Sequence, residues 1–468
     1  MEMRYMTLLR TKFGAGRGRR RCRQVAVLGA ALSLAACDLK VVNPGKIASA
    51  DLEDPRLVHA VVIGAVSDVG YAALVPGLGG VFTMASLLSD ELVMSGTRQG
   101  PKSLSDGMVR DDYSEAQDWW GYLARSRWTT ENAVERAERL VEDPASDPDV
   151  ALASLFAGFA NRIGGDNFCH TVINKGPLEP YTKSFERAVE YFTKAIEVGT
   201  AAGVDSIVTA AYGGRAQAYM MLGEWDKAVE DARQVPTEFR LSIHNSSSGR
   251  NLNYYWTYTR GSVKNYTSWG TPYVAWGVDY TGDRNVGDPR VIVEPEVNTD
   301  GTPVLGPDNR RPIIKQRKYT GTTSPVPLVK GSEMRLIAAE AELVKGNWQA
   351  AIDSINALHN RLNQSPPSAW GTNRLTSVSA SSLDEAWEVL MRERGIELWL
   401  EGRRLADYRR WAHTPGKDKV PFTRVRQAAD SPDANDDPWV SVYQVNNELC
   451  LPISLTEKLA NPNIGGGK

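Results

Sequence analysis

The chain has 468 residues, of which 42% are hydrophobic and 24% charged, and its formal net charge is −2. This length is sufficient for more than one hydrophobic core. Nucleic-acid-binding proteins usually carry a clear basic excess, and the charge balance therefore argues against nucleic acid as a partner.

The N-terminal segment has the layout of a secretory signal. Five arginines between positions 17 and 23 precede Val25–Ala36, an apolar run of 12 mostly small residues. A basic region, a short apolar region and small residues before a cleavage site are typical of such signals. The apolar run is too short to span a bilayer, which takes about 20 residues. We expect residues 1–36 to be removed as a signal peptide.

The end of this segment, Leu34-Ala35-Ala36-Cys37, resembles a bacterial lipobox. In such a sequence the cysteine is acylated, with palmitate for example, and becomes the first mature residue, so we predict a lipoprotein anchored at Cys37. More than one acyl chain is needed for stable anchoring. The alternative is an ordinary signal peptide with an incidental cysteine.

Removal of the signal changes the charge and the cysteine content. The remaining chain has 46 basic and 55 acidic residues, a net charge of −9. No later segment is expected to cross a bilayer, which leaves a soluble body on a lipid tether. Of the cysteines other than Cys22 and Cys37, only Cys169 and Cys450 remain, and disulfides persist in an oxidising compartment. We predict that these two pair; the alternative is two buried thiols.

Apolar residues recur with the 3.6-residue period of helices along much of the chain. Thr130–Val141 and Leu152–Ile163 are predicted to form one helical pair. Phe185–Val198 is predicted to pack against the helix that follows it. Leu383–Trp411 is predicted to form one or two further helices.

An internal repeat with a constant offset of 123 residues supports helical hairpins. Small residues, a glycine, a tryptophan and an alanine recur in the same order, at Ala216, Gly223, Trp225 and Ala228 and again at Ala339, Gly346, Trp348 and Ala351. The glycines suit the tight turn, the tryptophans fill the wedge, and the alanines let the helices approach closely. The pattern resembles tetratricopeptide repeats. Helical repeats are expected around 130–236 and 331–411.

Residues 241–330 interrupt the repeats, so we do not expect a continuous array. This insert is rich in Gly, Asn, Ser, Thr, Tyr and Trp, and its later part contains repeated Pro, Gly and Asp residues that break helices. The segment Pro415–Pro438 is expected to be another loop. Nine aromatic residues fall within 27 positions of the insert: Tyr254, Tyr255, Trp256, Tyr258, Tyr266, Trp269, Tyr273, Trp276 and Tyr280.

The C-terminal part resembles a known family. Residues 392–411, RERGIELWLEGRRLADYRRW, are similar to the ERxxELxxEGxRxxDLxRW signature of the SusD/RagB family. Leu451-Pro452-Ile453 and Asn461-Pro462-Asn463 resemble that family's closing element, and Asn43-Pro44 its segment after the lipobox. Tyr408 stands where Leu is common, and Ser454 where Pro often follows.

The resemblance implies a mostly α fold: a tetratricopeptide-like scaffold of helical hairpins, the SusD-like α-superhelix, with long irregular loop-rich insertions. It covers residues 37–468 as a single domain. Members are outer-membrane lipoproteins at the cell exterior that bind oligosaccharides or other nutrients and deliver them to a SusC-like TonB-dependent transporter barrel. Asp38 only slightly weakens the outer-membrane prediction, although in some bacteria an aspartate there retains lipoproteins at the inner membrane.

The aromatic insert suggests where a ligand binds. Rings stack on the C–H faces of sugars, and planar polar groups bond their hydroxyls. We predict ligand contacts at Trp269, Tyr273 and Trp276, with Asp90 and Arg98 facing them from another loop-rich region. The alternatives are an aromatic core under a long loop or a surface that faces the transporter. Trp119 and Trp120 are interpreted as helix-packing residues.

Two charged segments have a functional and a structural interpretation. In the signature, Glu393 and Glu397 invite comparison with a catalytic pair, but i,i+4 pairing of Glu397, Glu401, Arg404 and Arg409 on a helix is the favoured interpretation. Asp433, Asn435 and Asp437 begin like a calcium loop, but Pro438 and Gln444 replace the required Gly and Glu. A solvated loop is expected.

No catalytic or cofactor motif is present. The five histidines lack paired ligand spacing, and phosphate-binding, hydrolase and dinucleotide fingerprints are missing. The sequence thus favours a non-enzymatic binding protein without cofactor or metal. Two other functions stay open: a glycoside hydrolase using Asp90 and Glu91 or Asp111 and Asp112, and a tetratricopeptide-type scaffold for protein interactions.

Overall fold

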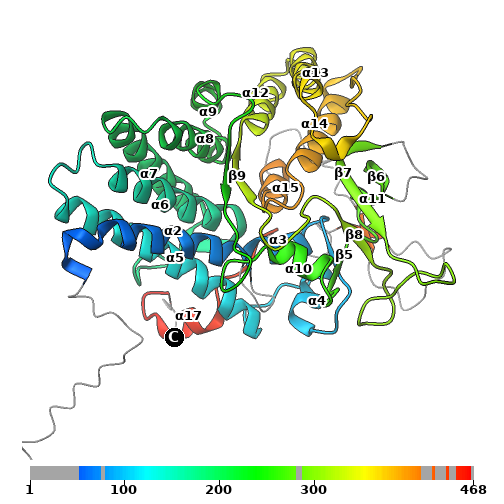
Figure 1. Cartoon of the computed structure of the whole chain (residues 1–468), viewed down its shortest axis with the longest axis horizontal. Helices are drawn as coiled ribbons and strands as arrows, with labels where there is room; N and C mark the ends of the chain where they lie inside the picture. The colour runs from blue at the N-terminus through cyan, green and yellow to red at the C-terminus, as the bar shows by residue number, and fades with distance from the viewer. Residues whose placement is uncertain are drawn as a thin grey trace, which may run out of the picture. The chain divides into compact units, whose positions relative to one another are not determined.

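The computed structural model describes residues 52–74, 80–280, 287–412, 424–426, 439–441 and 449–464. The predicted signal peptide, Cys37 and Asp38 lie outside these residues, as do Asn43-Pro44 and the calcium-like segment 433–437. From Glu53 onward the chain forms one compact unit, and Figure 1 shows its helices and strands.

An array of helices makes up one part of this unit, and each helix packs against the next one along it (Figure 1). The array consists of α2 (Val58–Leu74), α5 (Ser114–Leu140), α6 (Pro148–Asn167), α7 (Thr182–Ala201), α8 (Asp205–Leu222), α9 (Trp225–Arg233), α12 (Gly331–Val344), α13 (Trp348–Gln364) and α14 (Leu383–Glu397). The mostly α fold with helical hairpins is confirmed. The helices predicted at 130–141 and 152–163 are parts of the longer α5 and α6.

The turns of the internal repeat are those expected. Gly223 ends α8 with φ +76°, and Gly346 lies between α12 and α13 with φ +84°. A Cβ at either position would meet no atom within 4 Å. It is therefore the left-handed backbone, and not lack of space, that favours glycine. Ala228 and Ala351 are fully buried where the second helix of each hairpin meets the first.

The two hairpins are neighbours in space, which corrects the expectation of a discontinuous array. The ends of the insert pair as antiparallel strands, β4 (Arg240–Ile243) and β9 (Val326–Lys330). This pairing brings α12 against α9, so the array continues across the insert. The approach is close at Gly331, where a Cβ would lie 1.8 Å from the carbonyl oxygen of Pro236.

The insert has more regular structure than its composition predicts. Between β4 and β9 lie α10 (Tyr254–Thr259), β5 (Tyr266–Thr267), α11 (Pro272–Trp276), β6 (Gly277–Asp279), β7 (Asp288–Pro295) and β8 (Ile314–Gln316). β7 is the central strand of a three-stranded sheet, parallel to β6 and antiparallel to β8. β5 pairs with β1 (Val93–Met94) outside the insert.

Many aromatic side chains of the insert are part of the core. Six of its tyrosines are buried: Tyr254, Tyr255, Tyr258, Tyr266, Tyr273 and Tyr319. Tyr255 stacks on Tyr319 with ring centroids 5.7 Å apart, and Tyr273 stacks on Trp399 at 5.0 Å. For these residues the structure corresponds to the alternative of an aromatic core under a long loop.

The remaining elements belong to neither the array nor the insert. They are η2 (Pro55–Leu57), α3 (Val81–Leu88), α4 (Gln99–Ser105), β2 (His170–Thr171), β3 (Glu179–Pro180), η3 (Ser368–Trp370), α15 (Arg404–Ala412), β10 (Arg424–Arg426), β11 (Trp439–Ser441) and α17 (Leu455–Ala460). β10 and β11 pair antiparallel, so the segment expected as a loop at 415–438 contains one strand of a ribbon. Trp119 and Trp120 are buried helix-packing residues, as expected.

One helix of the array corrects the expectation that no later segment could cross a membrane. Pro55–Leu74 is long and apolar enough for a membrane span by length and composition. Half of its most apolar window is buried inside the fold, and α2 packs against α5 and α6. Its place in the core therefore accounts for the apolar composition.

A disulfide ties the C-terminal segment to the array. Cys169, just after α6, is bonded to Cys450, with a Cα–Cα distance of 5.1 Å and a sequence separation of 281. The backbones run side by side there: Leu451 N–H donates to the Asn167 carbonyl at 2.7 Å, and Cys169 N–H donates to that of Leu451 at 3.0 Å. The predicted pairing of these two cysteines is thus present in the structure.

Candidate functional site

Two adjoining cavities open between the insert and the end of α13. Their volumes are about 500 Å³ and 400 Å³, and they share Pro289, Ile292, Arg317, Ala369 and Trp370 as walls. We call them together the Trp370 groove. The first cavity is also lined by Thr237, Glu238, Phe239, Arg240, Arg290, Lys318, Lys330, Ser332, Leu362, Ser365, Pro367, Ile396 and Glu397. The second is also lined by Val278, Asp279, Tyr280, Thr320, Gly371, Thr372 and Asn373.

Strand alternation explains why β7 supplies much of the wall. Val291 and Val293 are buried on one face of β7, while Arg290 and Ile292 point to the other face and line the groove. Successive side chains of a strand point to opposite faces. Arg317 follows β8, and its N–H donates to the Ile292 carbonyl at 2.9 Å, which fixes it beside this wall.

The second cavity has an exposed aromatic ring at its wall. Tyr280 is 54% exposed, although most tyrosines of the insert are buried. The Arg317 guanidinium lies 3.3 Å from the centroid of the Tyr280 ring and pairs with Glu294 at 2.6 Å. A ring backed by a guanidinium has its orientation restricted before any ligand arrives. Trp370, which is mostly buried, lines both cavities.

A third cavity, of about 520 Å³, lies beyond Pro289 and differs in chemistry. Its lining includes Asp288, His359, Arg392 and Glu393 but no Phe, Tyr or Trp side chain. Ligand pockets generally combine aromatic walls with a few polar groups. The Trp370 groove is therefore the better candidate site among the described residues.

Buried charges form the base of the groove. Glu397 accepts hydrogen bonds from Ser332 Oγ at 2.6 Å and Lys330 Nζ at 2.9 Å, and Arg290 lies 3.4 Å away. Burial alone raises the pKa of Glu397, but Lys330 and Arg290 outweigh it and hold that pKa well below its usual range. Burial likewise raises the pKa of Glu393, and Arg290 with His359 lowers it to about 2. Both carboxyls are thus held ionised.

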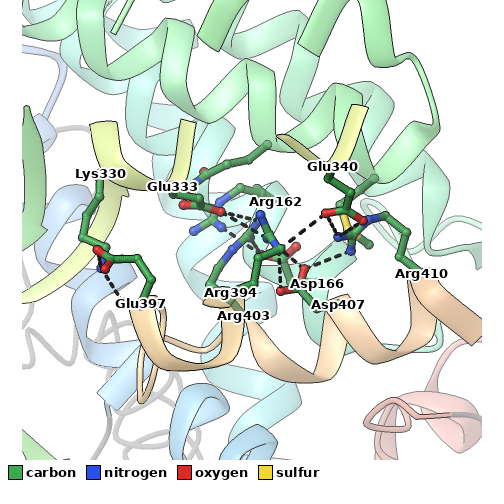
Figure 2. Close-up of polar contacts among 12 residues, drawn as sticks. Arg162, Asp166, Lys330, Glu333, Glu340, Arg394, Glu397, Arg403, Asp407 and Arg410 are labelled. Atoms are coloured by element: carbon green, nitrogen blue, oxygen red, sulfur yellow. Dashed lines mark hydrogen bonds and ion pairs between the residues drawn. The ribbon is translucent and has the colours of Figure 1, made fainter. Parts of the chain in front are cut away.

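The ion pairs continue beyond the groove and connect distant elements (Figure 2). Asp407 on α15 accepts two hydrogen bonds from Arg394 on α14, both at 2.9 Å. Arg410 pairs with Glu340 on α12 through contacts of 2.7 and 2.6 Å. Further pairs join Arg403 to Glu333 at 3.3 Å and Arg162 to Asp166 on α6 at 2.9 Å.

This network corrects the expected i,i+4 pairing within one helix. Residues 383–411 form two helices, one of the two predicted arrangements, and the break lies between α14 and α15, where Leu400 has φ +57° and Gly402 φ +68°. Across this break Glu401 pairs with Lys318 at 2.6 Å, and Arg404 pairs with Asp90. Arg409 donates to backbone carbonyls, among them that of Phe168 at 2.9 Å. The charges are structural, as expected, but their partners are tertiary.

A buried carboxyl holds the break in place. Glu91 Oε1 accepts the Leu400 N–H at 2.6 Å, and Glu91 Oε2 contacts the Ser86 hydroxyl at 2.7 Å. Ser86 also contacts the Tyr255 hydroxyl at 2.8 Å, and Tyr255 donates to the Phe82 carbonyl at 2.9 Å. If Glu91 is protonated, its hydroxyl donates to Ser86, the Ser86 hydroxyl donates to Tyr255, and the Tyr255 hydroxyl donates to the Phe82 carbonyl. If Glu91 is ionised, the single Tyr255 proton cannot serve both Ser86 and Phe82.

Two of the predicted ligand residues belong to the core instead. Asp90 is fully buried and accepts hydrogen bonds from Arg404 at 2.9 and 3.0 Å and from the Tyr408 hydroxyl at 2.5 Å. Tyr273 is fully buried against Trp399, and its hydroxyl donates to the Gly395 carbonyl at 3.2 Å. Their enclosure corrects the prediction that they contact a ligand.

The other three predicted ligand residues lie outside the groove. Trp269 and Trp276 are partly buried, and Trp276 packs on the Tyr273 ring with a centroid distance of 5.2 Å. Arg98 is exposed and lies 3.9 Å from Glu115. None of the three lines either cavity. Sequence reasoning placed the site within the aromatic cluster but at its middle, whereas only its last member, Tyr280, reaches the groove.

Several groove residues were missed by sequence reasoning. Trp370 lies in a Pro- and Gly-rich turn after α13, and an isolated tryptophan in such a turn was the available signal. The local sequence contains nothing that marks Phe239, Arg240 or Arg317 as part of a site. They meet only because β4 pairs with β9 and β7 pairs with β8.

Comparison with known proteins was made for sequence and for structure. Residues 306–465 match the model of the SusD family. A SusD superfamily protein from Bacteroides vulgatus superposes with a TM-score of 0.59 at 16% identity, covering 88% of this chain and 98% of the other. The family match thus covers the C-terminal third of the chain, and the solved structure shares the fold over most of the chain. A search of curated proteins found no match.

Other solved SusD-like structures share the fold over most of their length. A SusD-like carbohydrate binding protein from Bacteroides fragilis gives a TM-score of 0.63 at 14% identity, covering 86% of this chain and 98% of the other. A SusD superfamily protein from Parabacteroides distasonis gives 0.61 at 12% identity, covering 90% and 100%. The segment 392–411, which resembles the SusD/RagB signature, lies within the matched residues and supplies Arg394, Arg403, Asp407 and Arg410 to the buried charge network.

Glu91 gives the first prediction. Burial raises its pKa to about 7, against 4.5 in the unfolded chain. Because the folded pKa is the higher one, the contribution of Glu91 to stability is full below pH 4.5 and is lost as pH rises through about 7. Relative to wild type, Glu91→Gln should therefore gain about 3 kcal/mol of unfolding free energy between pH 4.5 and pH 8.

Urea unfolding of both proteins at several pH values measures this difference. Glu385→Gln, at an exposed carboxyl near the start of α14, is the matched control and should show little change in this range. A constant difference between Glu91→Gln and wild type at all pH values would contradict the protonated hydroxyl chain.

Proposed function

We propose that this protein is a SusD-like protein that captures oligosaccharides in the Trp370 groove. The observation that carries the proposal is an exposed, oriented aromatic ring beside planar polar groups in a cavity of a SusD-family fold. Tyr280 is exposed with Arg317 against it, and Asp279 and Asn373 line the same cavity. The structural likeness to a SusD-like carbohydrate binding protein supports the same ligand class.

The groove chemistry suits a sugar. The C–H face of a pyranose can lie on an aromatic ring, while its hydroxyls bond carboxylate, amide and guanidinium groups at the rim. The Tyr280 ring is oriented by Arg317, so little freedom is lost when a ligand stacks on it. Trp370 closes the wall between the two cavities, and a ligand longer than one sugar can extend across both.

The protein acts by binding and not by catalysis. A glycosidase needs a carboxylic acid that keeps its proton near neutral pH. The pKa of Glu393 is about 2, with Arg290 and His359 beside it, and that of Glu397 is also low. Glu91 has a raised pKa but is fully buried. Asp111 and Asp112 pair with Lys458 and Arg110.

Tyr280 gives the second prediction. Tyr280→Ala should weaken oligosaccharide binding roughly tenfold, because it removes a stacking surface worth about 1–2 kcal/mol. Trp128→Ala, which removes an equally exposed ring on α5 outside the groove, should leave binding unchanged. A glycan array followed by titration calorimetry measures both variants. Loss of binding in Trp269→Ala or Trp276→Ala with none in Tyr280→Ala would place the site elsewhere in the insert.

The delivery route is part of the proposal. The lipobox-like segment ending at Cys37 supports a lipid anchor at the outer membrane. The match of residues 306–465 to the SusD family supports a TonB-dependent transporter as the partner that receives the ligand. Capture at the cell surface then precedes transfer into the barrel.

The anchor gives the third prediction. Cells expressing the full chain and fed labelled palmitate should incorporate label into wild type but not into Cys37→Ser. Cys22→Ser, which changes a cysteine inside the predicted signal, is the matched control and should be labelled like wild type. Equal labelling of Cys37→Ser, or no labelling of wild type, would contradict anchoring at Cys37.

A further inference from the structure

The first cavity of the Trp370 groove has a cationic wall. Five cationic side chains line it, Arg240, Arg290, Arg317, Lys318 and Lys330, against two carboxylates, Glu238 and Glu397. Its chemistry therefore differs from that of a pocket lined only by rings and neutral polar groups. Whether this positive charge is already balanced depends on which carboxylates contact these five cations.

Most of these cations are paired beneath the surface. Arg290 contacts Asp288 and Glu393, both at 2.7 Å. Lys330 contacts Glu397 at 2.9 Å and Glu401 at 3.0 Å. Glu401 is shared, because Lys318 pairs with the same carboxylate. These four carboxylates surround Arg290, Lys318 and Lys330, and among the described residues none of the four forms an ion pair with Arg240.

Arg240 is a cationic residue of the cavity that these carboxylates do not contact. It is exposed, lines the cavity, and forms no ion pair with a carboxylate among the described residues. In the β4–β9 pair it stands directly opposite Lys330. Like charges at opposite positions of an antiparallel pair are destabilising. Burial and the Arg240 charge both disfavour the protonated form of Lys330, and it is Glu397 and Glu401 that keep its pKa raised.

The other carboxylate of the cavity does not compensate Arg240. Glu238 is exposed and pairs with Arg361 on α13. Arg317 shares Glu294 with Arg260, so that carboxylate also serves two cations. Burial, together with the neighbouring charge of Lys330, lowers the pKa of Lys318 to about 8. Glu401 opposes this shift. The cavity as it stands holds more positive charge than its neighbours neutralise.

We infer that this cavity is a subsite for the acidic group of a charged saccharide, a carboxylate or a sulfate, with Arg240 as its principal contact. The inference rests on the proposed function and names its ligand class: acidic oligosaccharides. The acidic group lies between Arg240 and Arg317, and neighbouring sugar units extend past Trp370 toward Tyr280. An anion there balances the charge of Arg240, which stands opposite Lys330 across β4 and β9.

The test is a glycan array that carries neutral, carboxylated and sulfated glycans, probed with the chain from residue 38 onward. Signals are expected on acidic glycans, and the carboxylated and sulfated sets show which anion is preferred. Titration of tetragalacturonate and of its neutral methyl ester then isolates the charge on one skeleton. The ester should bind at least about tenfold more weakly, because a charge-assisted hydrogen bond is lost.

Arg240→Gln should reduce binding of the acidic glycan about tenfold, and the loss should shrink at high salt. Arg233→Gln, at an exposed arginine on α9 that lines neither cavity, is the matched control. Thermal unfolding of both variants is the control for correct folding. Binding of neutral glycans that Tyr280→Ala abolishes and Arg240→Gln preserves would overturn the acidic subsite while sustaining the proposed function. Silence on every glycan would overturn both.

Discussion

The rest of the structure depends on the buried ion pairs around the break between α14 and α15. Arg394 on α14 pairs with Asp407 on α15, Arg410 on α15 pairs with Glu340 on α12, and Arg404 pairs with Asp90, which lies 314 positions earlier in the sequence. Buried charges are costly to desolvate and are tolerated only when partners surround them. Each member of the network therefore requires the others in place. This mutual requirement explains why a charged sequence motif can specify a fold.

The groove is a consequence of the same arrangement. Lys330 ends β9, pairs with Glu397 and Glu401, and contributes to the groove wall. Arg290 on β7 reaches Glu393 from the opposite side. The strands that bound the site are thus fixed to α14 through charges at their ends. The walls of the groove are irregular in sequence, but its base is held by the ion pairs of Glu393, Glu397 and Glu401.

Sequence reasoning was successful where the signal is local. Periodicity and the repeat with Gly223 and Gly346 predicted the helical hairpins, because turn geometry and packing of small residues are set within about 20 positions. It failed where the structure depends on pairing between residues that are far apart in the sequence. The β4–β9 pair makes the array continuous, and it places Arg240 opposite Lys330 across 90 residues of sequence. Ring count drew attention to the centre of the insert, yet burial of Tyr273 and exposure of Tyr280 depend on tertiary packing.

The most direct test of this account is amide hydrogen–deuterium exchange in Glu397→Gln at neutral pH. The substitution removes one charge from the base of the groove and leaves Lys330 and Arg290 less compensated. The account predicts faster exchange in β9, in β7 and around Trp370, with α6, α7 and α8 unchanged, because the strands lose their attachment to α14. Exchange altered only within α14, or unaltered throughout, would contradict the claim that these charges hold the groove.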